Sequence, residues 1–329
     1  MYPKVSVIMP TCKRAHFLVR AIESVLNQTY PNIEVVVVDD NSDDNESRLG
    51  TESVMQKYSS DERVKYIQNK DKCGGGISRN FGIEAAKGEY ITFLDDYDMY
   101  TPPKIESQLK FMMMHSLDMS FTDLHIYAPN GKLTEHRTRR FVRDWSTETL
   151  LKQHLIYALT STPTFMAKKD LLLKIGGFRN VPVGQDYVLM WDILEYAEKH
   201  SEVRVGYLPC SYIVVYLHNE GRISVGQRKI DGEMLLYKMR CSRKDMLTKN
   251  ESKFVDFRLY SVLAVTCKRG GMNKEFLKYA LKAFNISPVF TFREAFSFIK
   301  KRFESKDIRA PPVSYTHLLA HETEADLVC

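Results

Sequence analysis

No run of about 18 uncharged apolar residues occurs in this 329-residue sequence, so no segment is predicted to cross a bilayer as a helix. No signal peptide is expected either, because Met1 to Lys4 run directly into a strand-like segment. The six cysteines form no C-x-x-C pair and no zinc-like spacing, which is typical of a reducing compartment. They are Cys12, Cys73, Cys210, Cys241, Cys267 and Cys329. We therefore expect a cytoplasmic protein, with peripheral contact at the inner face of the membrane left open.

The sequence also has little excess charge. Its 47 Lys and Arg against 41 Asp and Glu give a net charge of +6, and the first half has no dense basic stripe with interleaved aromatic residues. Binding to nucleic acid needs such a stripe, so we expect no nucleic-acid partner. With 44% hydrophobic and 27% charged residues, the composition is that of a globular protein rather than a disordered chain.

Strand-like and helix-like patterns alternate over the first third of the chain. Short apolar runs that predict buried strands lie at 5–9, 35–38, 64–67 and 90–94. Amphipathic helical patterns separate them at 17–26, 44–58 and 76–87. This order predicts a Rossmann-like α/β fold, with a mostly parallel sheet and helices on both faces. From about Arg228 to Phe303 the pattern is helical throughout, which predicts an all-helical C-terminal appendage.

The segment 313–329 differs from everything before it. Its sequence, VSYTHLLAHETEADLVC, resembles peptides produced when sequencing-adapter DNA is translated. We interpret it as non-native and leave it out of the fold prediction. A genuine flexible tail is the alternative.

Two carboxylates follow the run of four valines at 35–38. These are Asp39 and Asp40. Since ligands of a doubly wound sheet bind beyond the carboxyl ends of its strands, both are candidates to accept hydrogen bonds from a base or a ribose. The continuation Asp-Asn-Ser is also good turn chemistry, so an ordinary solvated turn is the alternative.

A denser acidic cluster follows the strand predicted at 90–94. Asp95, Asp96 and Asp98 fall within four consecutive residues. Carboxylates this close repel one another unless a cation lies among them, and hard divalent cations that bridge to phosphates prefer such ligands. The cluster predicts a metal–diphosphate site. The alternative is a set of acids favoured near the N-terminus of the helix that follows Pro102.

Two further segments combine glycine with a charged side chain. In 74–80, three consecutive glycines let the backbone approach a ligand, and the planar fork of Arg79 can pair with a diphosphate. A glycine triplet is also common in ordinary loops. Gly184 and Asp186 stand at the start of a predicted helix, where the carboxylate is a general base or merely an N-cap. The residues alone favour the cap.

In their order along the chain, these segments resemble the family-2 inverting glycosyltransferases of the GT-A fold. The resemblance covers roughly residues 3–220, with four separated motifs at plausible spacing. The motifs are VSVIMPTCKR, AIESVLNQTYPNIEVVVVDDNSDD, GGGISRNFGIEAAKGEYITFLDDYD and GGFRNVPVGQDYVLMW. A dehydrogenase would instead carry G-x-G-x-x-G after the first strand, where this chain has the sequence PTCKR.

The resemblance implies roles for individual residues. It implies that the base, the ribose and the diphosphate of a nucleotide sugar are bound by Pro10, Thr11, Arg14, Asp39, Asp40, Arg79, Asp95 and Asp96. It implies that Mn²⁺ or Mg²⁺ on the donor diphosphate is held by Asp96, Asp98 and His218. It implies that Asp186 is the general base.

Two positions depart from the family's pattern. Tyr97 stands where the Asp-x-Asp-Asp motif of the family has its metal-binding carboxylate. Either Asp96 or Asp98 coordinates the metal instead, or the dependence on metal is weakened. Gln185 replaces the usual Glu of a Glu-Asp pair, and Asp186 is retained.

The family implies transfer of a hexose, with inversion, from a UDP-sugar to a hydroxyl of a glycan or lipid-linked acceptor in cell-surface polysaccharide synthesis. Tyr97 motivates an alternative, a catalytically impaired GT-A module that binds a nucleotide sugar or a glycan. A sugar-1-phosphate nucleotidyltransferase would need a Gly-rich, basic loop after the first strand, and the sequence has none there.

The expected domain organisation follows from the resemblance. We expect a GT-A domain over 1–225, with a nucleotide-sugar-binding half at 1–120 and an acceptor-binding half at 121–225. A helical region over 226–305 and a tail over 306–329 follow. The basic and aromatic residues of the helical region fit peripheral membrane contact, and equally a packed helical subdomain or a dimer surface. The oligomeric state is left open.

Overall fold

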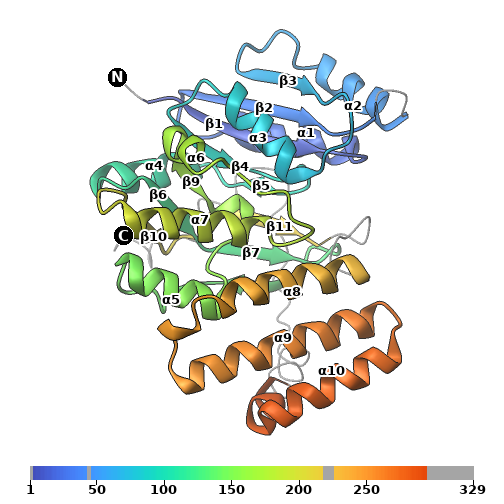
Figure 1. Cartoon of the computed structure of the whole chain (residues 1–329). Helices are drawn as coiled ribbons and strands as arrows, with labels where there is room; N and C mark the ends of the chain where they lie inside the picture. Colours follow the sequence, from blue (N-terminus) through green and yellow to red (C-terminus); the bar gives the residue numbers. More distant parts are fainter. Residues whose placement is uncertain (1–2, 43–45, 218–225, 295–329) are drawn as a thin grey trace.

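The computed structural model describes residues 3–42, 46–217 and 226–294, and at its centre lies a seven-stranded sheet with helices on both faces (Figure 1). Across this sheet the strands are β10 (Val205–Leu208), β6 (Met119–Thr122), β9 (Met166–Lys168), β4 (Tyr90–Phe93), β1 (Val5–Thr11), β2 (Ile33–Asp39) and β3 (Val64–Gln68). β1 is parallel to β2 and β4, and β2 is parallel to β3. Only β9 runs antiparallel to its neighbours in this described sheet. The predicted α/β sheet, mostly parallel, is confirmed.

The chain also forms a second, smaller sheet of four strands. In sheet order its strands are β5 (Met99–Tyr100), β11 (Ile213–Tyr216), β7 (Leu124–Tyr127) and β8 (Leu133–Arg137). β5 comes directly after the acidic segment 95–98 and pairs with β11. The acidic segment therefore connects the two sheets. β7 and β8 form an antiparallel hairpin.

Seven helices belong to the part of the described chain that precedes β10. They are α1 (Ala15–Leu26), α2 (Glu46–Gln56), α3 (Gly75–Ala85), α4 (Lys104–Met114), α5 (Thr147–Tyr157), α6 (Lys169–Lys174) and α7 (Gln185–Lys199), with a 3-10 turn, η1 (Thr162–Thr164). Helices α3 and α7 are the ones that carry candidate site residues. Both begin at a glycine, Gly74 and Gly184, with a positive φ.

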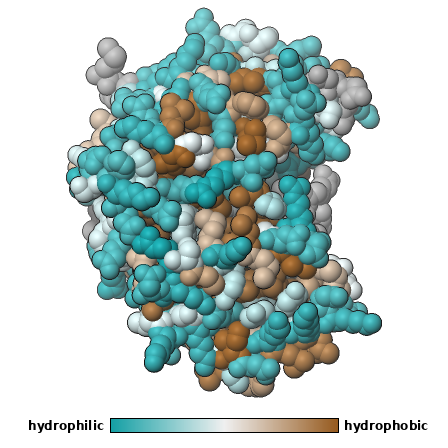
Figure 2. Space-filling model, viewed as in Figure 1, coloured by the Kyte–Doolittle hydropathy of each residue, from teal (hydrophilic) through white to brown (hydrophobic). Residues whose placement is uncertain are grey.

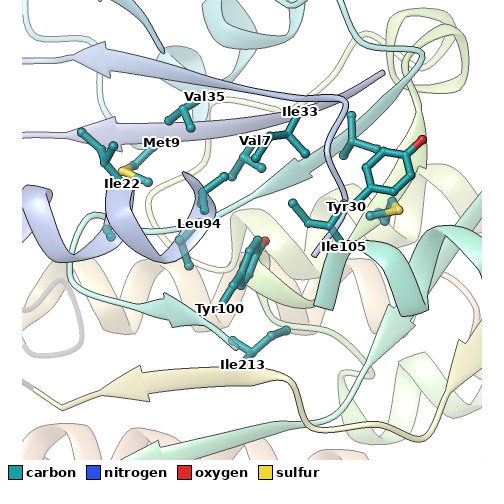
Figure 3. Packing of buried hydrophobic residues seen from close by; sticks show 14 of the residues in the cluster. Val7, Met9, Ile22, Tyr30, Ile33, Val35, Leu94, Tyr100, Ile105 and Ile213 are labelled. Atoms are coloured by element: carbon teal, nitrogen blue, oxygen red, sulfur yellow. The ribbon is translucent and has the colours of Figure 1, made fainter. Parts of the chain in front are cut away.

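The valine run of β2 shows why the central strands read as continuous apolar segments. Val35 and Val37 pack in one core with side chains of α1 and α4, among them Ile22 (Figure 3). Val36 and Val38 enter a second core on the opposite face of the sheet. All four valines are fully buried. A strand covered on both faces needs apolar residues at every position, which is what the sequence supplies.

The described part of the helical region, 226–294, packs on the sheet domain as well as on itself. It consists of α8 (Gln227–Cys241), a 3-10 turn, η2 (Lys244–Met246), α9 (Lys249–Arg269) and α10 (Asn273–Ile286). Leu236 of α8 shares a buried cluster with Tyr187 and Trp191 of α7. A separate cluster joins the three helices around Leu263. The predicted helical appendage is confirmed, and it buttresses α7.

The outward face of α10 is apolar. Leu277, Leu281 and Phe284 are 58%, 53% and 40% exposed. Figure 2 shows apolar surface (brown) at the end of the molecule where α10 lies in Figure 1. Beside this face, on the same helix, are Lys274, Lys278 and Lys282. Within the described ranges, no helix has both the length and the apolar character needed to cross a membrane.

Candidate active site

The carboxyl ends of β4, β1 and β2 lie side by side and bring several predicted site residues together. Thr11 ends β1, and its Oγ1 donates to Asp96 Oδ2 at 2.8 Å. The backbone N–H of Asp40, just past β2, donates to the carbonyl of Thr11 at 2.9 Å. Pro10 is buried inside β1 at the residue before. The rim predicted from the sequence is therefore present.

Asp40 anchors the loop that leads into α3. Its carboxylate accepts hydrogen bonds from the N–H groups of Cys73 and Gly74, at 2.8 and 2.9 Å, and from Asn69 Nδ2 at 3.0 Å. Burial acts to raise the pKa of Asp40, but these hydrogen bonds outweigh it, and the pKa falls below its usual value. Asp40 is thus an ionised carboxylate that accepts hydrogen bonds from the loop before α3. It fixes the glycine-led start of α3.

Asp39 points into the protein. Its side chain is fully buried and accepts hydrogen bonds from the backbone N–H of Asn41 at 2.9 Å and from the hydroxyl of Tyr66 at 2.6 Å. A nucleotide cannot reach this carboxylate without displacing those partners. The prediction that Asp39 binds the base or ribose directly is therefore not supported. Its geometry is that of a residue that shapes the turn after β2.

Arg79 connects the donor side of the predicted site to the start of α7. Its Nη2 lies 2.5 Å from Asp95 Oδ1, and its Nη1 donates to Gln185 Oε1 at 3.0 Å. Gln185 precedes Asp186, which is partly exposed. The guanidinium group of Arg79 therefore joins the acidic segment after β4 to the start of α7, where Asp186 lies. This is the juxtaposition that the resemblance requires.

The surroundings of Asp186 favour its protonated form more than water would. Desolvation raises the pKa of Asp186, as does the charge of Asp95, while the backbone N–H of Tyr187 and the charge of Arg79 oppose the rise. The net pKa is above the usual aspartate value. The N-cap of α7 is Gly184, so Asp186 is not the cap that the residues alone favoured. Its carboxylate is available for proton transfer.

Two residues that the sequence analysis did not single out support the start of α7. The buried imidazole of His154 accepts a hydrogen bond at Nδ1 from Leu159 N–H (3.1 Å), so Nε2 carries the proton and donates to the carbonyl of Tyr187 at 2.9 Å. Burial lowers the pKa of His154 to about 3 and keeps it neutral. From α8, the guanidinium of Arg240 lies over the Tyr187 ring, 4.8 Å from its centroid. No local pattern reveals these contacts, because their partners are distant in sequence.

The remaining acids of the segment 95–98 are engaged within the protein. Asp96 is fully buried, with Arg14 Nε at 3.1 Å from its Oδ1. Burial raises the pKa of Asp96 to about 6 against the opposing effects of Arg14 and Thr11. Asp98 is buried at the start of β5, and its Oδ1 accepts from the backbone N–H of Tyr216 at 3.1 Å. Burial also raises the pKa of Asp98 well above its usual value.

The three carboxylates of the predicted Mn²⁺ or Mg²⁺ site all contact protein groups. Across the described ranges, no three His, Cys, Asp or Glu side chains are grouped so that they could hold a metal ion. Asp95 is engaged by Arg79 and by the hydroxyl of Tyr97, whose oxygen lies 3.1 Å from Asp95 Oδ2. Asp96 faces an arginine, and Asp98 faces β11. The third predicted ligand, His218, lies outside the described residues.

Solved structures support the fold. TarS 1–349 of S. aureus, in complex with UDP-GlcNAc, is similar with a TM-score of 0.60 and 18% identity, covering 88% of this chain and 82% of that one. The mannosyltransferase PcManGT from Pyrobaculum calidifontis, in complex with GDP-Man and Mn²⁺, is similar with a TM-score of 0.59 and 15% identity, over 92% and 83%. At this identity the likeness shows the fold alone, and it confirms the predicted GT-A architecture.

Sequence relatives carry the assignment further. Minor teichoic acid biosynthesis protein GgaB of Bacillus subtilis is 31% identical over 204 residues, which are 60% of this chain and 22% of that protein. Glycosyltransferase GlyG of Streptococcus pneumoniae is 34% identical over 123 residues, 37% of this chain and 40% of that protein. The chain thus spans less than half the length of either relative. The family model described as glycosyl transferase family 2 matches residues 6–176, just over half of the sequence. The chain belongs to glycosyl transferase family 2.

Proposed function

We propose that this chain transfers a hexose, with inversion, from a UDP-sugar to a hydroxyl of a glycan or lipid-linked acceptor in the synthesis of a cell-surface polysaccharide. The observation that carries the proposal is the bridge from Asp95 through Arg79 to Gln185, because it sets the acidic segment at the strand ends beside Asp186. The UDP-GlcNAc bound by TarS supports a UDP-sugar donor, and the family of this chain supports sugar transfer. The GDP-Man bound by PcManGT makes a GDP-sugar the competing donor to test.

The proposed reaction is one in-line displacement at the anomeric carbon. Asp186 removes the proton from the acceptor hydroxyl while the hydroxyl oxygen bonds to that carbon and the bond to the nucleoside diphosphate breaks. An α-linked donor then gives a β-linked product. Residues 1–120 hold the donor in this scheme, and residues 121–225 shape the acceptor side. The positive charge of Arg79 offsets charge that builds on the leaving diphosphate.

The pH dependence of turnover tests the role of Asp186. A general base must be ionised, so the raised pKa of Asp186 predicts that kcat/KM falls on the acid side at a pH above the usual aspartate range. Because the charge of Arg79 lowers the pKa of Asp186, Arg79→Gln is expected to move this acidic limb to higher pH. The measurement is UDP release from UDP-hexoses with an acceptor, as a function of pH, with the anomeric configuration of the product read by NMR. An acidic limb in the usual aspartate range that Arg79→Gln leaves in place would contradict the assignment.

A catalytically impaired module that binds a nucleotide sugar or a glycan is the second candidate, and Tyr97 is the observation that favours it. In the structure the Tyr97 hydroxyl contacts Asp95, where the family has a carboxylate. The same assay separates the candidates. Nucleotide-sugar binding without release of UDP, for every donor and acceptor pair tried, favours the module.

We propose further that α10 holds the protein at a membrane that carries the acceptor. Its exposed Leu277, Leu281 and Phe284 lie beside three lysines, a combination that suits an anionic lipid surface. Replacing the three apolar residues with Ser is expected to weaken co-sedimentation with vesicles containing anionic phospholipid by roughly tenfold or more, since each buried apolar side chain contributes about 1.5–3 kcal/mol.

The matched control replaces Met113 and Met114 of α4, which are 55% and 78% exposed, with Ser. This variant is expected to sediment with vesicles as the unaltered chain does. If the unaltered chain ignores vesicles and forms a dimer that the α10 variant loses, the face is a subunit interface instead.

A further inference from the structure

Two of the three carboxylates in the acidic segment are each paired with one arginine. Arg79 Nη2 lies 2.5 Å from Asp95 Oδ1, and Arg14 Nε lies 3.1 Å from Asp96 Oδ1. Neither carboxylate therefore presents surplus negative charge. A divalent cation is drawn to carboxylates that would otherwise repel one another, and it competes poorly for carboxylates already paired with guanidinium groups.

Tyr97 contributes to this arrangement in two ways. Its hydroxyl donates to Asp95 Oδ2 at 3.1 Å, and its ring lies under the guanidinium of Arg14, 4.8 Å from centroid to Cζ. An aspartate at this position would add a fourth carboxylate to the segment and could not form the cation–π contact. The side chain that takes the metal-ligand position of the family thus holds Arg14 in place.

Arg14 is the arginine that a ligand can reach. Its side chain is 25% exposed, compared with 8% for Arg79. The hydrogen bond described for Arg14 uses Nε, which leaves the two terminal nitrogens as donors for another group. A planar guanidinium matches two phosphate oxygens at once, which is how arginine binds phosphates most strongly.

We propose that Arg14 binds the diphosphate of the donor directly, with Asp96 and Tyr97 as its positioning residues, so that this chain binds its nucleotide without a divalent cation. The inference rests on the proposed function, because it takes a nucleoside diphosphate as the ligand. Arg14 then adds to the positive charge that Arg79 supplies near the leaving group.

The test is calorimetric titration of the full chain with UDP, and in parallel with GDP, first in EDTA and then in excess MnCl₂. The affinity of the unaltered chain is expected to be the same in both. Arg14→Met is expected to weaken binding by about ten- to a hundredfold in EDTA, since paired charge-assisted hydrogen bonds are lost. Arg63→Met removes an equal charge from a side chain that is 45% exposed and paired with Asp61, and it is expected to change nothing.

The variant Tyr97→Asp makes the test sharper, because it adds the missing carboxylate. Its binding is expected to become tighter in MnCl₂ than in EDTA by about tenfold or more. If Arg14→Met fails to fold in a thermal melt, Arg14→Lys keeps the charge without the planar fork and is expected to lose about tenfold in affinity.

The outcomes separate the two proposals. Nucleotide binding by the unaltered chain only in MnCl₂ overturns the inference and leaves the proposed function standing. Equal affinity of the unaltered chain and folded Arg14 variants also overturns the inference alone. Binding of neither nucleotide in either buffer removes the proposed function, and the inference with it.

Discussion

Asp186→Asn is expected to lower turnover by roughly two to four orders of magnitude, the usual contribution of a positioned general base, while the affinity for the nucleotide is unchanged. The amide has nearly the same shape as the carboxylate but cannot accept the proton of the acceptor hydroxyl. Its neighbours keep the backbone in place: Tyr187 is held by His154 and Arg240, and Gly184 packs against Leu236. The loss should therefore appear in kcat. The measurement is steady-state UDP release together with nucleotide titration.

The matched control is Asp192→Asn, the same chemical change further along α7. Asp192 pairs with Arg179, and burial raises the pKa of Asp192 to about 6, so a neutral side chain is less unfavourable there than at a solvated aspartate. Turnover is expected to be close to that of the unaltered chain. Equal losses in both variants would mean that the helix, rather than the base, had been damaged. Unchanged turnover in Asp186→Asn would remove Asp186 from the chemistry.

The sequence predicts the central sheet well because its strands are covered on both faces. Four consecutive valines, Val35 to Val38, predict a strand buried on both faces, and all four side chains are indeed buried. The two residues of β5 and the four each of β10 and β11 are too short to show a period, so these three strands went unpredicted.

The direction of a side chain at a strand end is harder to predict than its presence. Asp39 and Asp40 are chemically identical neighbours, but successive residues of a strand point to opposite sides, and only pairing with β1 decides which is which. Asp39 is covered by Tyr66, and Asp40 turns to the loop before α3. Likewise nothing near Asp186 in the sequence indicates Arg240, because their proximity depends on how α8 packs.

Asp40→Ala is expected to destabilise the protein by about 3 kcal/mol or more. The N–H groups of Cys73 and Gly74 and the amide of Asn69 lose their acceptor, and each buried, unsatisfied donor costs about 1–3 kcal/mol.

The pH dependence of stability gives a second signature of Asp40. The native pKa of Asp40 is below its value of 3.8 in a model peptide, so its ionised form stabilises the fold fully above that value and loses this effect as the pH falls through the native pKa. The difference in unfolding free energy between the unaltered chain and Asp40→Asn, measured by denaturant titration, should therefore narrow in acid. Asp71→Ala, an exposed carboxylate in the same loop, is the control and should change stability little. Should Asp40→Ala instead keep full stability and lose only nucleotide affinity, then Asp40 reads the base, as the resemblance implies, and the loop before α3 is held by other contacts.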